Sequence, residues 1–190
     1  MNPYQHITKI RMKKCTDAQL SLQNALISLN QHRAINTITV KDLCQQAHVA
    51  RSTFYSYYDN VMQLQEEIED NLLYQLLQLN DNLKKMPVGE DADFTFLQNV
   101  FEFMQQNKQV FYAFLIAAPN VQFISKWKEA IKYHFWERFF RNMSQKNERL
   151  ILEAIASQAI TMYAFWLQNP YEVDIDSLNK LILKVLEVLI

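Results

Sequence analysis

Residues 38–58 read ITVKDLCQQAHVARSTFYSYY, and this stretch decides the fold. Its apolar side chains recur at helical spacing in two short groups, with the break between them at His48. Thr39 can cap the first group, and Asp42 lies three residues later, where it can complete a capping box. The pattern predicts two short helices joined by a tight turn, which is a helix-turn-helix.

The second of these helices carries polar side chains on the faces that Phe54 and Tyr58 leave free. Arginine, hydroxyl and phenol groups can read base edges and bind phosphates in a DNA major groove. The start of the first helix adds a hydroxyl and an ammonium group at a helix N-terminus, where phosphate binds readily. The candidate DNA-binding residues are Thr39, Lys41, Arg51, Ser52, Thr53, Tyr55, Ser56 and Tyr57. In the alternative, Tyr55 and Tyr57 pack under neighbouring helices, which is the position we expect for Phe54 and Tyr58.

The same stretch resembles the DNA-binding region of the TetR family of bacterial transcriptional regulators. The matching residues are ITVKDL at 38–43, AHV at 47–49, RSTFY at 51–55, YYDN at 57–60, and Leu64. They cover about the first third of the chain; beyond them only the all-helical plan and Trp166-Leu167 match. The resemblance implies an all-α fold, with a DNA-binding helix-turn-helix region in residues 1–60 and a regulatory and dimerisation bundle in residues 61–190.

The resemblance also implies a function. Members of this family act as homodimers that bind double-stranded DNA at a near-palindromic operator, usually repress transcription, and are released by a small-molecule effector. The paired reading helices would then contact half-sites about one helical turn, ~34 Å, apart. The resemblance further implies that Tyr55 and Tyr57 contact phosphate.

Three residues depart from the family's pattern. His48 stands where the turn usually has glycine, although histidine adopts a positive φ more readily than branched residues do. Ala50 replaces the usual polar cap of the reading helix, which forfeits roughly 1 kcal/mol. Val61 replaces a lysine that often lies near phosphate. These losses favour an alternative function, in which a TetR-like chain has lost operator binding and acts as a protein-interaction co-activator.

The glycine count narrows the class of protein. The chain of 190 residues contains one glycine, so it lacks the glycine-rich phosphate loops and nucleophile elbows of many enzymes. So few glycines also disfavour a fold built on tight turns between strands. Both observations favour an all-α protein.

Charge is unevenly distributed along the chain. Residues 1–58 hold seven Lys or Arg against two Asp, a net charge of +5, whereas residues 59–190 hold 12 basic and 18 acidic residues, a net charge of −6. A basic N-terminal part on an acidic remainder is typical of a protein that binds a polyanion with one end. The alternative is a surface asymmetry without function.

No pattern indicates catalysis or a bound cofactor. The four histidines, at positions 6, 32, 48 and 134, are scattered and have no metal-ligand spacing. Cys15 and Cys44 form neither a C-x-x-C motif nor a disulfide framework. We therefore expect no enzyme activity, no cofactor and no metal. A signal-peptide core is absent, and the longest apolar run, 110–118, is too short to span a bilayer, so we expect a cytoplasmic protein with no membrane partner.

The rest of the chain is expected to be helical, with one clear loop at residues 84–93. Apolar periodicity predicts helices at residues 5–33 (broken near 15–16), 61–83, 94–106, 108–118, 120–143, 148–168 and 178–190. The basic residues 11–14 either reach DNA phosphate or form a solvated arm. The last two helices present wide apolar faces, which either pack within the chain or pair with their copies as a four-helix dimer interface.

Eighteen of the 24 aromatic residues lie in residues 92–190. A cavity lined by aromatic and methionine side chains would suit an apolar or cationic aromatic ligand. The candidate ligand-binding residues are Phe103, Tyr112, Trp127, Tyr133, Trp136, Met162 and Tyr163. The alternative for each of them is an ordinary place in the hydrophobic core.

Overall fold

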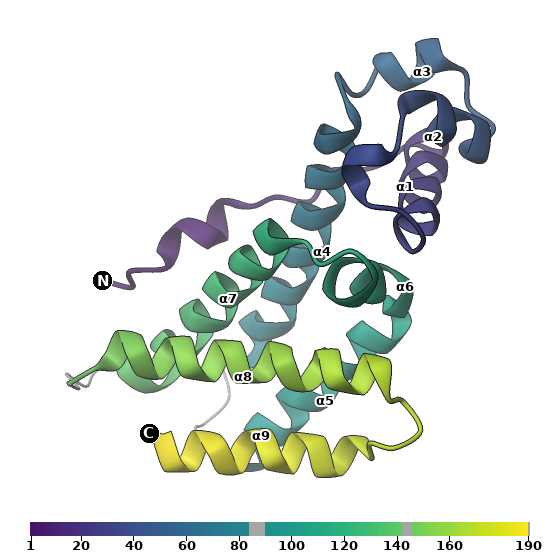
Figure 1. The fold of residues 1–190 in the computed structure, drawn as a ribbon. Helices are drawn as coiled ribbons and strands as arrows, with labels where there is room; N and C mark the ends of the chain where they lie inside the picture. The colour runs from purple at the N-terminus through teal and green to yellow at the C-terminus, as the bar shows by residue number, and fades with distance from the viewer. Residues whose placement is uncertain (84–89, 142–145, 190) are drawn as a thin grey trace.

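A computed structural model describes residues 1–83, 90–141 and 146–189, and all regular structure in these ranges is helical (Figure 1). The helices are α1 (Asp17–Asn30), α2 (Val40–Ala47), α3 (Arg51–Tyr55), α4 (Val61–Leu83), α5 (Glu90–Gln106), α6 (Lys108–Tyr112), α7 (Val121–Phe135), α8 (Glu148–Gln168) and α9 (Ile175–Leu189). Short 3₁₀ helices span Gln5–Lys9 and Ile35–Thr37, and π-helical segments at Ala113–Ala117 and Trp136–Phe140 continue α6 and α7. The predicted all-α class is confirmed.

Helices α1 to α3 form a compact group at one end of the molecule, which we call the head (Figure 1). Local signals in the sequence produce it. Thr39 and Asp42 form the expected capping box at the start of α2, and His48 ends α2 in the left-handed conformation with φ 53° and ψ 38°. Leu43 and Phe54 are completely buried in the core beneath. The helix-turn-helix prediction is therefore confirmed in its geometry.

Helix α4 is the connector between the two ends of the molecule (Figure 1). Asn60 caps it, because its side-chain oxygen accepts from the Gln63 amide at 3.0 Å. The predicted apolar stripe is buried from Leu64 to Leu76, against α1 at the head end and against α5 and α7 further along. The 23 residues of α4 therefore contact both ends of the molecule.

Helices α5 to α9 form the second group, which we call the body. Helix α8 packs between α7 and α9, and its buried side includes Ile155, Tyr163 and Trp166. With 21 residues and a mean hydropathy of 1.4, α8 is long and apolar enough to cross a membrane by those two measures. The core helix of a soluble protein passes the same test, and 44% of the apolar window of α8 is buried within the structure. The sequence estimate missed it because polar residues interrupt the apolar run.

Several expected boundaries were wrong. The helix predicted for residues 5–33 is a 3₁₀ helix, a non-helical segment at residues 10–16, and then α1. Helix α5 starts at Glu90, four residues before the expected position, while residues 84–89 of the predicted loop lie outside the described residues. Helix α9 starts at Ile175 because Asp174 accepts from the Ser177 amide at 2.9 Å. Asn147 precedes α8 but makes no side-chain cap.

Candidate nucleic-acid interface and ligand cavity

The candidate reading helix α3 lies on the outer surface of the head, at the end of the molecule opposite α8 and α9 (Figure 1). Seven of the eight candidate DNA-binding residues are exposed, and Thr53 is half-buried. Tyr55 is 52% exposed and Tyr57 is 38% exposed, so neither packs under a neighbouring helix. Phe54 and Tyr58 are buried, as expected. The fold therefore brings the eight candidates to one end of the molecule and leaves their polar groups facing solvent.

Helix α3 is shorter than the sequence suggested and begins without a side-chain cap at Ala50. A local hydrogen bond stabilises the C-terminal end of α3, where the Ser56 hydroxyl donates to the Thr53 carbonyl at 2.7 Å. The ring of Phe54 meets the ring of Tyr55 edge-on at 5.4 Å between centroids, which holds the exposed phenol against the head. A single helical turn, held in place by these contacts, therefore presents the arginine and hydroxyl groups.

Helix α2 contacts α3, and its start adds a second set of groups. The Thr39 hydroxyl accepts from the Asp42 amide at 3.1 Å, and Asp42 forms an ion pair with Arg33 at 3.2 Å. Hydrogen bonds from Thr39, with a contribution from Arg33, hold the pKa of Asp42 below its ordinary value. The carboxylate is thus paired within the head, while the ammonium of Lys41 is exposed.

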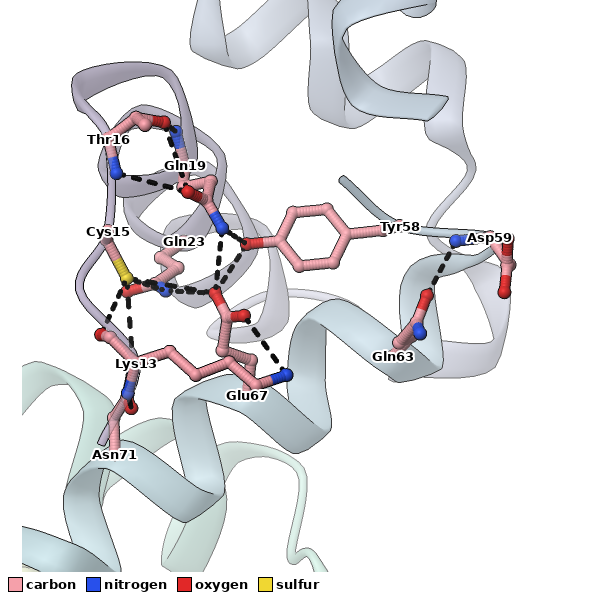
Figure 2. Close-up of polar contacts among 10 residues, drawn as sticks. All are labelled: Lys13, Cys15, Thr16, Gln19, Gln23, Tyr58, Asp59, Gln63, Glu67 and Asn71. Atoms are coloured by element: carbon pink, nitrogen blue, oxygen red, sulfur yellow. Dashed lines mark hydrogen bonds and ion pairs between the residues drawn. The ribbon is translucent and has the colours of Figure 1, made fainter. Parts of the chain in front are cut away.

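A buried carboxylate on α4 holds the end of the reading region (Figure 2). The Tyr58 hydroxyl donates to Glu67 Oε1 at 2.6 Å, and Gln23 Nε2 of α1 donates to the same oxygen at 3.0 Å. Gln19 Nε2 lies 3.5 Å from this oxygen, and Lys13 Nζ lies 3.9 Å from the other. Burial and the bond to Glu67 raise the pKa of the Tyr58 phenol well above its ordinary value, so the phenol stays a donor.

A second buried carboxylate lies on another side of α4 and joins it to the body. Glu69 Oε1 accepts from Gln65 Nε2 at 2.8 Å and from Asn120 Nδ2 at 2.6 Å. Lys126 Nζ of α7 lies 3.3 Å from Glu69 Oε2 and 2.9 Å from Asp70 Oδ1. Burial alone would lower the pKa of Lys126, but the two carboxylates outweigh it and raise that pKa. Helix α4 is therefore fastened at Glu67 to the head and at Glu69 to the body.

Sequence reasoning missed both glutamates. One signal was present: Glu67 is three residues after Leu64 and one before Ile68, so it falls on the apolar stripe, where a charged residue must find partners. No sequence signal of this kind indicates the role of Glu69, because its partners at α7 are more than fifty residues away in sequence.

The N-terminal segment does not lie with the head but on the outer side of α7. The buried Asn2 side chain donates to the Tyr133 carbonyl at 3.0 Å and to Glu137 Oε1 at 2.9 Å. The chain then runs along α4, where the Lys13 amide donates to Asn71 Oδ1 at 3.0 Å. The side chains of the basic residues 11–14 are exposed beside the head. Their predicted contact with phosphate stays a prediction.

The body encloses an apolar cavity next to the connector. Its lining residues are Leu76, Phe96, Leu97, Val100, Trp127, Ala130, Ile131, His134, Phe135, Ile155, Gln158, Ala159, Tyr163, Ile182 and Val185. Two of the candidate ligand-binding residues, Trp127 and Tyr163, are among them. Their rings lie nearly parallel, with centroids 6.2 Å apart. Spacing along α7 could have found more of the lining, because Ala130, Ile131 and His134 follow Trp127 at three, four and seven residues.

The other five candidates lie elsewhere. Phe103 and Tyr133 are buried but do not line this cavity. Tyr112 is 37% exposed in a polar groove beside α1. Trp136 donates its Nε1 to Glu148 at 2.7 Å, and Met162 lies in an open groove next to α9. Across the described parts of the chain, no three His, Cys, Asp or Glu side chains gather closely enough to hold a metal ion.

Comparison with known proteins defines the class to which this geometry belongs. No family model matches the sequence. The chain is 26% identical over 128 residues to the HTH-type dhaKLM operon transcriptional activator DhaS of Lactococcus lactis subsp. lactis (strain IL1403), a match that covers 64% of this chain and 63% of that relative.

Solved structures match over nearly the whole chain. The fatty acid degradation regulator FadR from Bacillus halodurans superposes with a TM-score of 0.69 at 14% identity, covering 92% of this chain and 96% of that one. A TetR transcriptional regulator from Streptococcus agalactiae 2603V gives 0.68 at 22% identity, covering 95% and 94%. The fold is that of helix-turn-helix transcriptional regulators. More particularly, it is the all-α fold of the TetR family, as the resemblance in residues 38–60 predicted.

Proposed function

We propose that this chain is a TetR-like transcriptional regulator that binds operator DNA through its head and a small-molecule effector through its body, in the cytoplasm. The observation that carries the proposal is the exposed reading helix. Arg51, Ser52 and Tyr55 stand on one turn at the outer end of the head, and α2, which begins with the cap Thr39 and carries Lys41, contacts this helix. Arginine can bind guanine in bidentate fashion, and the hydroxyl, phenol and ammonium groups suit phosphate.

The charge distribution supports the same orientation on DNA. The first 58 residues carry a net charge of +5 and the remainder a net charge of −6, so the head is attracted to a polyanion and the body is repelled by it. Because phosphate contacts release bound counterions, the affinity for duplex DNA should fall steeply as salt rises.

The proposal includes a homodimer formed by the last two helices. Phe165 on α8 is 53% exposed and Leu181 on α9 is 51% exposed, and both line one open apolar groove with Met162 and Leu178. A two-fold axis through this face would place two copies of α8 and α9 in a four-helix arrangement. The two heads would then contact half-sites of a near-palindrome about one helical turn, ~34 Å, apart.

The effector would act through α4. Leu76 of α4 lines the cavity, and the buried carboxylates of Glu67 and Glu69 fasten the same helix to the head and to α7. A bound molecule that favours one position of α4 would therefore change the spacing of the heads. It can do so only by its difference in affinity for the two arrangements. We propose repression as the resting effect, while the curated relative is named an activator, so a reporter assay must be able to detect both signs.

A mobility-shift titration on the DNA upstream of the chain's own gene tests the proposal. We expect Arg51→Ala to weaken binding about 5- to 100-fold, the range for one bidentate base contact, and Tyr55→Ala to weaken it by less. The matched controls are Arg141→Ala and Tyr171→Ala, exposed residues of the same types in the body, which should leave binding unchanged. Equal affinity of Arg51→Ala, Tyr55→Ala and wild type would refute the assigned interface.

One observation favours the second candidate function, a protein-interaction co-activator. Helix α3 begins at Ala50 with no side-chain cap, and Val61 stands where a phosphate-binding lysine is common. A chain that no longer needs to bind an operator could lose the polar cap and the phosphate-binding lysine without losing its function. Two results together would favour this function over the first. One is the capture of one specific protein in a complex that persists at high salt, and the other is the absence of salt-dependent binding to duplex DNA.

A further inference from the structure

One residue that lines the cavity in the body carries a polar group that the described part of the chain does not satisfy. The ring of Tyr163 lines the cavity and the residue is only 2% exposed, yet its hydroxyl has no hydrogen-bond partner among the described residues. A buried hydroxyl without a partner costs ~1–3 kcal/mol, and nearly all such groups in folded proteins are satisfied by protein, water or ligand. An orphaned donor in the wall of an apolar cavity therefore points to an acceptor that comes from outside the chain.

The rest of the lining offers no counter-ion for a cation. None of the fifteen lining residues is Asp, Glu, Lys or Arg, and Gln158 and His134 are polar members of the lining. Arg138 and Asp93 line an adjoining smaller cavity, which shares Phe96 and His134, and they form an ion pair with each other. A cation in the main cavity would lose its hydration without gaining a counter-ion, which is strongly unfavourable.

We infer that the cavity binds a neutral, largely apolar molecule with one hydrogen-bond acceptor, such as a carbonyl oxygen, and that the Tyr163 hydroxyl donates to this acceptor. Trp127 packs against the Tyr163 ring and supplies a flat apolar wall beside the acceptor. The regulatory role of such a molecule rests on the proposed function, whereas its binding does not. Burial also raises the pKa of the Tyr163 phenol far above its ordinary value, so the group remains a donor at all working pH.

The size of the cavity limits the molecule. The cavity is small, with a volume of about 50 Å³. A ligand therefore fits closely between the side chains and displaces some of them, and the smallest useful probe is a single substituted ring. Since Leu76 of α4 is part of the lining, this displacement reaches the connector directly.

The experiment uses two probes of nearly equal shape, acetophenone with a carbonyl and ethylbenzene without one. Dissociation constants are measured by titration of the full chain followed by NMR, without DNA. In wild type we expect acetophenone to bind, and Tyr163→Phe to weaken it about three- to tenfold, the effect of one neutral hydrogen bond. The same substitution should leave ethylbenzene unchanged or slightly tighter. Trimethylphenylammonium, the charged probe, should not bind.

Two further variants are controls for the removed hydroxyl and for the site of binding. Tyr112→Phe removes a hydroxyl outside the cavity and should change neither dissociation constant. Ala159→Met fills the cavity and should abolish binding of both neutral probes. The inference is overturned if neither neutral probe binds, if Tyr163→Phe affects both probes equally or not at all, or if the ammonium probe binds as well as acetophenone.

The outcome of the probe titrations can be distinguished from the outcome of the test of the proposed function. Should the probes behave as expected while the chain fails to bind duplex DNA, the cavity assignment stands and the regulator proposal fails. Should the chain bind DNA through Arg51 while Tyr163→Phe has no selective effect, the regulator proposal stands and the inference fails.

Discussion

At the residue scale, the turn of the helix-turn-helix depends on one strained position. His48 has φ 53°, a left-handed conformation that costs a residue with a Cβ ~1–2 kcal/mol and costs glycine almost nothing. The sequence could predict this position, because the turn falls between two periodic apolar groups and His48 stands where the family has glycine. Caps were equally predictable at Thr16 and Thr39, since both partners of each capping box lie within three residues.

We expect His48→Gly to raise the free energy of unfolding by about 0.5–1 kcal/mol, because glycine relieves the strain although it also makes the unfolded chain more flexible. Urea unfolding followed by circular dichroism measures this. The control is Asn147→Gly at the other left-handed position, φ 68°, where asparagine is already tolerated and the change should be a few tenths of a kcal/mol. A loss of stability in His48→Gly would mean that the imidazole makes a compensating contact.

Two buried tyrosines show what the sequence could not reveal at this scale. Tyr58 donates to Glu67 at 2.6 Å, and Tyr163 has no partner in the described parts of the chain, yet both are tyrosines at apolar positions of the sequence pattern. Only the three-dimensional arrangement distinguishes them, because the partner of Tyr58 comes from another helix and the surroundings of Tyr163 come from several.

Tyr58→Phe should therefore destabilise the protein by about 1.5–3 kcal/mol, the usual cost of losing a buried hydrogen bond to a charged group. Tyr163→Phe is the matched control, since it removes a buried hydroxyl that has no partner among the described residues, and it should be neutral or stabilising. Thermal unfolding of both variants checks the difference. Equal destabilisation by the two substitutions would contradict the role assigned to the Glu67 cluster.

At the element scale, helices α7 and α8 are joined by a half-buried ion-pair cluster. Lys128 Nζ lies 2.9 Å from Glu153 Oε1, and Lys132 Nζ lies 2.7 Å from Glu153 Oε2. Hydrogen bonds from Lys132 and Lys128 lower the pKa of Glu153 to about 2, from an ordinary value of 4.5. The position of the helices was predictable from apolar periodicity, but their pairing across the body was not, because periodicity does not say which faces meet.

The lowered pKa sets the pH window of this cluster. The ionised carboxylate is favoured in the folded chain, so its contribution is fully present above pH 4.5 and is lost as the pH falls through about 2. We expect Glu153→Gln to be slightly less stable than wild type near pH 7, and this difference to disappear towards pH 2. The effect should be small, because the side chain is 44% exposed and solvent screens it. A difference that grows on acidification would contradict the assignment.

At the scale of the whole molecule, the features that matter are the separation of charge and the uncovered apolar face of α8 and α9. Both were visible in the sequence, the first as a count of charges and the second as apolar periodicity in the last two helices. Which apolar residues stay exposed was not visible. Leu178 and Ile182 face the core, whereas Leu181, on the same helix, is 51% exposed.

Leu181→Glu should convert the proposed dimer to a monomer at micromolar concentration, because a charge buried in an apolar interface without a partner is strongly unfavourable. Sedimentation equilibrium gives the molecular mass directly. Leu20→Glu is the control, since Leu20 is a similarly exposed leucine, 46%, on α1 in the head. The interface is misassigned if Leu181→Glu remains dimeric or if Leu20→Glu dissociates as well.

The N-terminal segment provides a second linkage between α7 and the head. One linkage to α7 runs through Lys126 and Glu69 into α4, and the other begins where Asn2 binds the Tyr133 carbonyl and returns to the head beside Asn71. The opposite side of α7 lines the cavity. Under the proposed function, a shift of α7 on effector binding would therefore reach the head through both linkages, and loss of either one would leave the other to transmit it.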